Sequence, residues 1–169
     1  MVVALTTLFS FNVCQAQGPY GEVNFIKTLP NMGESFLIDM KTSKKLANGY
    51  RWNKENFEAG IDIPASAESR ADVGVITTLD DMIKWSLALN DNRLLNPESI
   101  KFMFSPGTLK TGMPVPYGYG WYIYFFRDQL IYEHGGAFRT GFNSRISRFP
   151  KSGIEIIILS NIRMGPENV

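Results

Sequence analysis

The 169-residue sequence predicts an α+β domain in which one antiparallel sheet packs against helices. Two observations predict this class: two capped helical segments lie in the middle of the chain, and four β-prone segments joined by short turns follow them. Strands joined by short turns pair antiparallel, and the helices must then cover one face of the sheet. Apolar residues make up 44% of the chain and charged residues 20%, an ordinary globular usage that argues against collagen, coiled coil and disorder.

The charged residues and the metal-binding residue types exclude several classes of function. Seventeen Lys+Arg against sixteen Asp+Glu give a net charge of +1, and no basic run is present, so we expect no nucleic-acid partner. One cysteine, Cys14, and one histidine, His134, cannot supply the ligands of a zinc or iron–sulfur site. We therefore expect no metal and no cofactor.

The first sixteen residues read as a secretory signal peptide. An apolar run of about a dozen residues ends at Cys14-Gln15-Ala16 and is too short for the roughly 20 residues of a membrane-spanning helix. We therefore divide the chain into a leader, residues 1–16, and a folded part, residues 17–169, and expect a secreted or periplasmic protein. The alternative is a buried first strand or helix of an intact domain.

Two helices are expected, near residues 78–90 and 97–104. Thr78 can cap the first helix, with Asp81 at its third position. The second helix begins at Asn96-Pro97, a capping side chain followed by Pro in the first turn. The first helix carries an apolar stripe that predicts packing on a core. Its members are Leu79, Met82, Trp85, Ile83, Leu87 and Leu89.

After Pro116 the sequence predicts strands. They are expected near residues 117–126, 130–134, 142–149 and 154–159, with turns at Arg127-Asp128 and Pro150–Gly153. The last strand, IEIIIL, is apolar on both sides except for Glu155, which is typical of a central strand covered on both faces.

His134 is followed at once by Gly135-Gly136. Taken alone, a single histidine is an ordinary structural residue. Two glycines at a strand end, however, allow another chain or a substrate to approach the backbone closely. The N–H groups of such a strand end could bind a carbonyl or a carboxylate beside the imidazole.

A series of short motifs, taken in chain order, resembles a known superfamily. The motifs are Ala47-Asn48-Gly49-Tyr50, the segment from Ala71 to Asp81, Tyr117-Gly118-Tyr119-Gly120-Trp121, His134-Gly135-Gly136 with Gly141-Phe142, and Leu159-Ser160-Asn161. Over roughly residues 30–162, this series resembles the C-terminal half of the serine β-lactamase and penicillin-binding-protein superfamily. The nearest branch is the β-lactamase-related one (class C-like, esterase and D-aminopeptidase-like).

The resemblance implies a partial β-lactamase/transpeptidase-like fold and acyl transfer through a serine ester. His134 matches the third motif, as the histidine variant of Lys-Thr-Gly. The resemblance further implies that His134 faces the catalytic groove and that Gly135 and Gly136 bind substrate. It also implies that the backbone N–H of Ala137 forms half of the oxyanion hole.

The first and second motifs of the family, Ser-x-x-Lys and Tyr-x-Asn, are not matched by this sequence. None of the twelve serines has Lys three positions later, so the Ser-x-x-Lys nucleophile motif is absent, and no tyrosine has Asn two positions later. The sequence therefore predicts a hydrolase of amides or esters, represented by its C-terminal portion and inactive alone. Its partners would be a small-molecule or peptide substrate.

Lys110-Thr111-Gly112 spells the third motif literally. Its segment, residues 105–116, contains three prolines, which argue against a paired strand, so we interpret the triplet as a loop coincidence.

Two other interpretations of the whole chain stay open. One is a non-catalytic module that binds peptides or cell-wall fragments in the groove beside His134, and the other is a remnant without function. The sequence after residue 161 offers no room for the closing helix of the family, so we also expect an uncovered sheet face and self-association through it.

Overall fold

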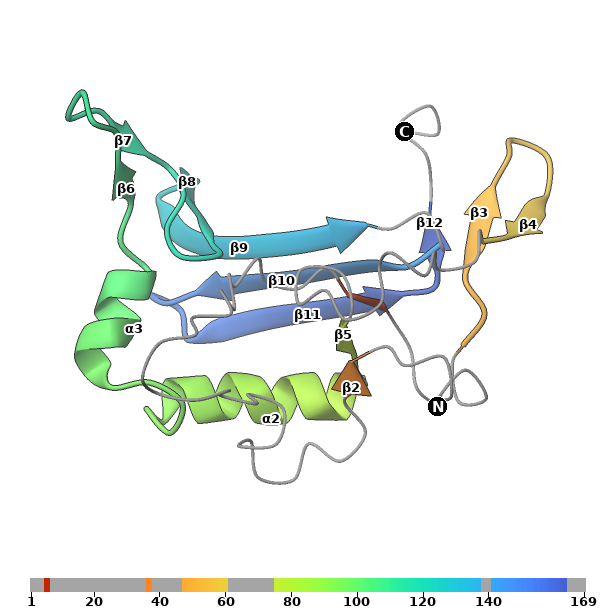
Figure 1. Cartoon of the computed structure of the whole chain (residues 1–169), viewed down its shortest axis with the longest axis horizontal. Helices are drawn as coiled ribbons and strands as arrows, with labels where there is room; N and C mark the ends of the chain where they lie inside the picture. Colours follow the sequence, from red (N-terminus) through yellow and green to blue (C-terminus); the bar gives the residue numbers. More distant parts are fainter. Residues whose placement is uncertain (1–4, 7–35, 38–46, 61–74, 138–140, 164–169) are drawn as a thin grey trace.

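The computed structural model describes residues 5–6, 36–37, 47–60, 75–137 and 141–163. Its largest sheet has the strand order β11-β10-β9-β8, and every neighbouring pair is antiparallel (Figure 1). The four strands are β8 Tyr122–Phe126, β9 Gln129–Ala137, β10 Asn143–Phe149 and β11 Ile154–Ser160. With two helices packed against this sheet, the predicted α+β class is confirmed.

Two of the expected strand boundaries were wrong. Residues 118–121 are not strand, and Tyr117 makes only a single bridge to Tyr122. Gly118 lies so close to the preceding helix that an added Cβ would meet the Met103 carbonyl oxygen at 2.5 Å. Gly120 has φ +82°, a backbone conformation that favours glycine and is not that of a strand. In the opposite direction, β9 continues past His134 as far as Ala137.

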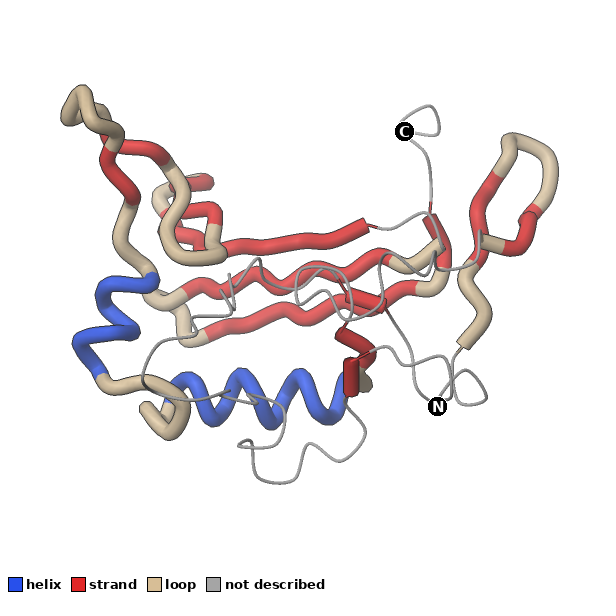
Figure 2. Tube along the Cα trace, viewed as in Figure 1, coloured by secondary structure: helices blue, strands red, loops and turns tan. Residues whose placement is uncertain are grey.

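Both predicted helices are present, with the predicted caps. Helix α2 spans Leu79–Asn90, and the Thr78 side chain accepts a hydrogen bond from the Asp81 backbone N–H at 3.1 Å. Helix α3 spans Pro97–Met103, and the Asn96 side chain accepts from the Ser99 N–H at 2.8 Å. Figure 2 shows α2 running along the sheet beside β11, with α3 across its end.

The buried face of α2 differs from the expected stripe. Met82 and Leu89 are buried as predicted, but Leu79, Ile83 and Leu87 are 44–52% exposed. The helix instead turns polar groups toward the sheet, because Ser86 donates a hydrogen bond to Glu155 of β11 at 2.5 Å. An apolar pattern alone could not reveal this, since the partner lies 69 residues away.

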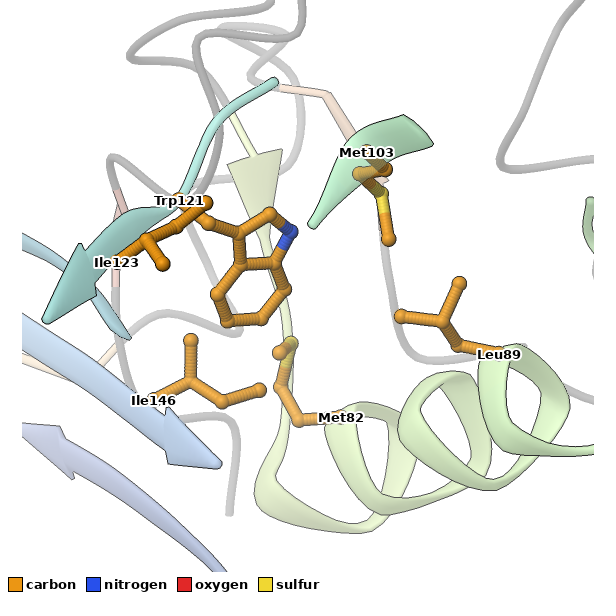
Figure 3. Packing of buried hydrophobic residues seen from close by; sticks show 6 residues of the cluster. All are labelled: Met82, Leu89, Met103, Trp121, Ile123 and Ile146. Atoms are coloured by element: carbon orange, nitrogen blue, oxygen red, sulfur yellow. The ribbon is translucent and has the colours of Figure 1, made fainter. Parts of the chain in front are cut away.

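The core lies between α2, α3 and one face of the sheet (Figure 3). Trp121 and Ile146 are both fully buried at its centre. Figure 3 shows Met82 and Leu89 reaching up from α2 toward them, with Met103 approaching from α3. Burying side chains of this size stabilises the fold by about 2 kcal/mol each, which makes this cluster the main link between helices and sheet.

The expectation that residues 154–159 form a central strand was wrong for the described structure. β11 is the terminal strand of the four-stranded sheet and has one neighbour there, β10. Its residues alternate in exposure: Ile157 packs against the core, whereas Ile154, Ile156 and Ile158 are 55%, 45% and 51% exposed. We call these three residues the isoleucine row.

Three small sheets complete the described structure. Their order is β1-β5-β2, β12-β3-β4 and β6-β7. The strands are β1 Leu5–Thr6, β2 Phe36–Leu37, β3 Tyr50–Trp52, β4 Phe57–Ala59, β5 Val75–Ile76, β6 Gly107–Thr108, β7 Pro114–Val115 and β12 Ile162–Arg163. Apart from β1, the predicted leader lies outside the described residues, and the leader therefore stays a prediction.

Candidate active site

The end of β9 extends beyond its outer neighbour. β8 pairs with β9 only as far as Tyr122 opposite Glu133, whereas β10 pairs with β9 through to Asn143 opposite Ala137. Residues 134–137 therefore pair with β10 on one side and with no strand of the described structure on the other (Figure 1). We call this four-residue stretch the overhang; its outer edge carries backbone groups that an extended ligand can reach.

His134 is the first residue of the overhang. It lies opposite Ile146 in the β9–β10 register, so its side chain is on the helix-covered face of the sheet. Burial lowers the pKa of His134 below its ordinary value, which favours the neutral imidazole. A neutral imidazole can both donate and accept a hydrogen bond, as acyl-transfer chemistry requires of a proton-handling group.

Two tyrosine rings flank this imidazole. The Tyr122 ring is stacked at 6.0 Å between centroids with 23° between planes, and the Tyr117 ring lies at 6.3 Å, tilted by 62°. The two phenol rings also contact each other edge-on, at 4.8 Å. Sequence reasoning did not assign either residue to the site, although both lie in or beside the Tyr117–Trp121 motif.

The opposite face of β9 carries an ionic cluster next to the site. Glu133 accepts hydrogen bonds from Arg145 and, at 2.7 Å, from the Ser147 hydroxyl. Burial alone would raise the pKa of Glu133, but these hydrogen bonds and the Arg145 charge outweigh it and hold the pKa below its ordinary value. The cluster keeps Glu133 ionised and fixes the strand that carries His134.

A hollow of about 400 Å³ borders the same strand end. Gly135, Arg145 and Ile158, which line it, occupy one register row of β9, β10 and β11, and strand alternation places this row on the face opposite His134. Gly136 and Ala137 also line the hollow, but His134 does not. His134, Gly135 and Gly136 all lie along the open edge of β9, so this edge and not the hollow is the candidate site.

Three of the motifs quoted for the resemblance meet behind the overhang. The Tyr50 N–H donates to the Asn161 carbonyl at 2.7 Å, and the Asn161 amide donates to the Asn48 carbonyl at 2.9 Å. Gly141, with φ +95°, lies so close that an added Cβ would meet the Tyr50 nitrogen at 2.3 Å. These residues join segments more than 90 residues apart in sequence and anchor the chain on both sides of the site.

The structure keeps Lys110-Thr111-Gly112 away from this site. The triplet lies in the turn between β6 and β7, on a hairpin that projects from the molecule (Figure 1). Its interpretation as a loop is confirmed, but a short ladder does form, because Thr108 pairs with Pro114. The prolines shortened the strands to two residues each without abolishing the pairing.

Of the three catalytic motifs of the family, the described residues contain only the third. His134, Gly135, Gly136 and Ala137 form the overhang. The Ser-x-Asn form of the second motif does occur in the sequence, as Ser10-Phe11-Asn12, and lies outside the described residues. Within the described ranges, no group of three His, Cys, Asp or Glu side chains could hold a metal, and no helix is long and apolar enough to cross a membrane.

Comparisons with known proteins agree with this architecture. The Beta-lactamase family matches residues 30–168. A D-aminopeptidase of Gluconobacter oxydans (strain 621H) is 28% identical over 90 residues, which are 53% of this chain and 17% of that protein. Among solved structures, a penicillin-binding protein from Bacillus halodurans is similar with a TM-score of 0.66 at 23% identity, covering 86% of this chain and 44% of that one.

A second solved structure has a similar fold. The D-amino acid amidase from Ochrobactrum anthropi SV3, complexed with L-phenylalanine amide, gives a TM-score of 0.64 at 18% identity, covering 83% of this chain and 42% of that one. The chain thus spans less than half the length of each of these proteins. The family match covers most of the 169 residues, and the chain belongs to the Beta-lactamase family.

Proposed function

We propose that this chain forms the third-motif wall of an acyl-transfer site that acts on amides or esters. The overhang of β9 is the observation that carries the proposal, because it leaves His134 beside an unpaired strand edge. A substrate in extended conformation can pair with this edge, and the Ala137 N–H then serves as one donor to the developing oxyanion. Gly135 and Gly136 keep side chains out of the substrate's path.

The similar proteins suggest which substrates to test first. One is a D-aminopeptidase and another a D-amino acid amidase, so we propose D-amino acid amides and short peptides as the substrate class. In the proposed pose the scissile carbonyl oxygen lies near the Ala137 N–H, and the imidazole lies close enough to hold or move a proton.

We infer that the nucleophile of the acyl-transfer site is not supplied by these 169 residues. No serine in the sequence has the Ser-x-x-Lys arrangement that activates the hydroxyl in this family. Without a nucleophile–base pair, acyl transfer loses orders of magnitude in rate, whereas ground-state binding at the strand edge remains. We therefore propose that the 169 residues bind substrate but do not become acylated.

Two measurements on the same protein test this function. Nuclear magnetic resonance with D-phenylalanine amide should shift the amide signals of the overhang and the ring signal of His134. L-phenylalanine amide, the ligand of the similar amidase structure, tests whether the site distinguishes the two enantiomers. Intact-mass spectrometry after incubation with a fluorophosphonate should show no adduct. Absence of any ligand-dependent shift contradicts the proposed site, and a stoichiometric adduct contradicts the assignment of the nucleophile.

The second candidate function is a non-catalytic module that binds peptides or cell-wall fragments. The absence of Ser-x-x-Lys favours it, because the overhang can pair with a peptide without chemistry. The two candidates separate when a polypeptide that carries Ser-x-x-Lys is added: turnover of the amide supports the acyl-transfer site, and binding without turnover supports the module.

We also propose that residues 1–16 are a leader and that the protein is secreted or periplasmic, on the basis of the apolar run that ends at Ala16. N-terminal sequencing of exported material should then begin at Gln17. In the structure Leu5–Thr6 pairs with Val75–Ile76, the arrangement expected if the segment is instead a first strand of the domain. Recovery of a folded chain that retains Met1 would favour that alternative.

A further inference from the structure

Tyr117 and Tyr122 approach His134 from a loop and from a strand, which are joined by a single β-bridge between these two residues. Tyr122 is the first residue of β8, opposite Glu133 in the sheet. Tyr117 is held by its backbone, whose N–H donates to the Val115 carbonyl at 2.7 Å and whose carbonyl accepts from the Gly107 N–H at 2.9 Å. The two rings contact each other edge-on, and both lie beside the same imidazole.

The three rings form one contact set at the start of the overhang. The near-parallel Tyr122 ring covers a face of the imidazole, and the Tyr117 ring meets it close to edge-on. Aromatic rings at these separations favour such stacked and edge-on arrangements. An imidazole held on two sides keeps one orientation relative to the open strand edge.

We propose that Tyr117 and Tyr122 are positioning residues that hold the His134 imidazole in one orientation at the third-motif position. This inference rests on the proposed function, since it deepens the role of the same site. The rings act through His134, so we assign them no contact with the reacting atoms. Their effect is to present the same imidazole nitrogen to whatever occupies the overhang.

Charged side chains on the elements around His134 are paired with one another. On the neighbouring strand, Arg145 is bound to Glu133, and Arg148 is bound to Glu155 and Asn90. On α2, Asp81 forms an ion pair with Lys84. Burial lowers the pKa of His134. The two phenol rings, with centroids 6.3 Å and 6.0 Å from that of the imidazole, lie close enough to contribute to this burial. Removal of a ring therefore admits water to the imidazole.

The single histidine makes the test direct, because one ring signal reports on His134 alone. We expect Tyr122→Leu to move the His134 pKa, measured by nuclear magnetic resonance in the ligand-free chain, up toward the ordinary value of about 6.5. Tyr122→Phe keeps the ring and should leave the titration unchanged. Tyr119→Leu is the matched control, because that exposed ring packs on Phe102.

If the His134 titration is unchanged in both Tyr122→Leu and Tyr117→Leu, the inference is wrong. The ligand-induced shifts that test the proposed function are measured separately, so the proposed function can hold even if this inference fails. If the leucine variants do not fold, nuclear Overhauser effects in the unsubstituted chain decide the question. Contacts from the His134 ring to both tyrosine rings support the inference, and their absence overturns it.

Discussion

His134 shows how one residue can combine a structural and a chemical role. Its side chain shares the helix-covered face with Ile146, yet it also begins the overhang. A histidine in such a place must be neutral for the fold and still reachable for a ligand. Protonation of His134 should therefore change both the stability of the folded chain and the chemistry of the site.

Folding stability should therefore depend on pH through His134. Its pKa is lower in the folded chain than in the unfolded chain, where it is about 6.5, so between these values the unfolded state binds more protons. The free energy of unfolding should fall as pH decreases below about 6.5. Denaturant unfolding followed by fluorescence between pH 5 and 8 measures this.

His134→Gln should flatten that profile, since no other histidine is present. Glu133 loses its stabilising contribution only further into acid, because its pKa is held below the ordinary carboxyl value. A wild-type stability that stays constant from pH 8 to pH 5 would contradict the role assigned to burial of the imidazole.

Several individual residues could be assigned from sequence, because their role is local. The Thr78 and Asn96 caps depend on residues three positions away and were predicted correctly. Tyr117 and Tyr122 could not be assigned to the site, since their relation to His134 depends on the pairing of β8 with β9. The overhang was missed for the same reason: the length of a neighbouring strand decides where an edge is open.

At the scale of elements, a polar network joins α2 to the sheet. Arg148 of β10 forms an ion pair with Glu155 of β11 at 3.2 Å, and Glu155 also accepts from Ser86 of α2. The two charged side chains are 10% and 17% exposed. The network explains why α2 turns Ser86 toward the sheet and leaves Leu79, Ile83 and Leu87 exposed, against the expectation from apolar spacing.

We expect Arg148→Leu to destabilise the protein by about 3 kcal/mol, because it leaves the Glu155 carboxylate buried without its partner. The double substitution Arg148→Leu with Glu155→Leu should recover much of this loss, since neither charge then remains buried. Urea unfolding of the two single variants and the double variant gives the coupling energy. Additive losses would show that Arg148 and Glu155 are not energetically coupled across β10 and β11.

At the scale of the whole molecule, the exposed isoleucine row is the most prominent apolar feature of β11. The isoleucine row lies on one strand at the end of the sheet, and β11 has neither Pro nor Lys to protect it. We propose that copies of this chain associate through the isoleucine row. Exposed apolar rows of this kind commonly mark interaction surfaces in soluble proteins.

Ile156→Ser with Ile158→Ser should lower the average mass measured by light scattering toward that of one chain. Leu109→Ser is the control, because Leu109 is equally apolar, 49% exposed, and lies on the β6–β7 hairpin. A monodisperse monomer in the unsubstituted chain would contradict self-association, as would an assembly unaffected by the double substitution.

The overhang also sets a length scale for its ligand. Four residues of β-strand extend about 13 Å, and the Tyr117 and Tyr122 rings stand at the end where β8 begins. The open strand edge therefore has the length of about four residues of an extended peptide. Affinity in a series of D-amino acid oligomers should rise up to that length and then level off. A continued rise would mean that ligands extend beyond residues 134–137.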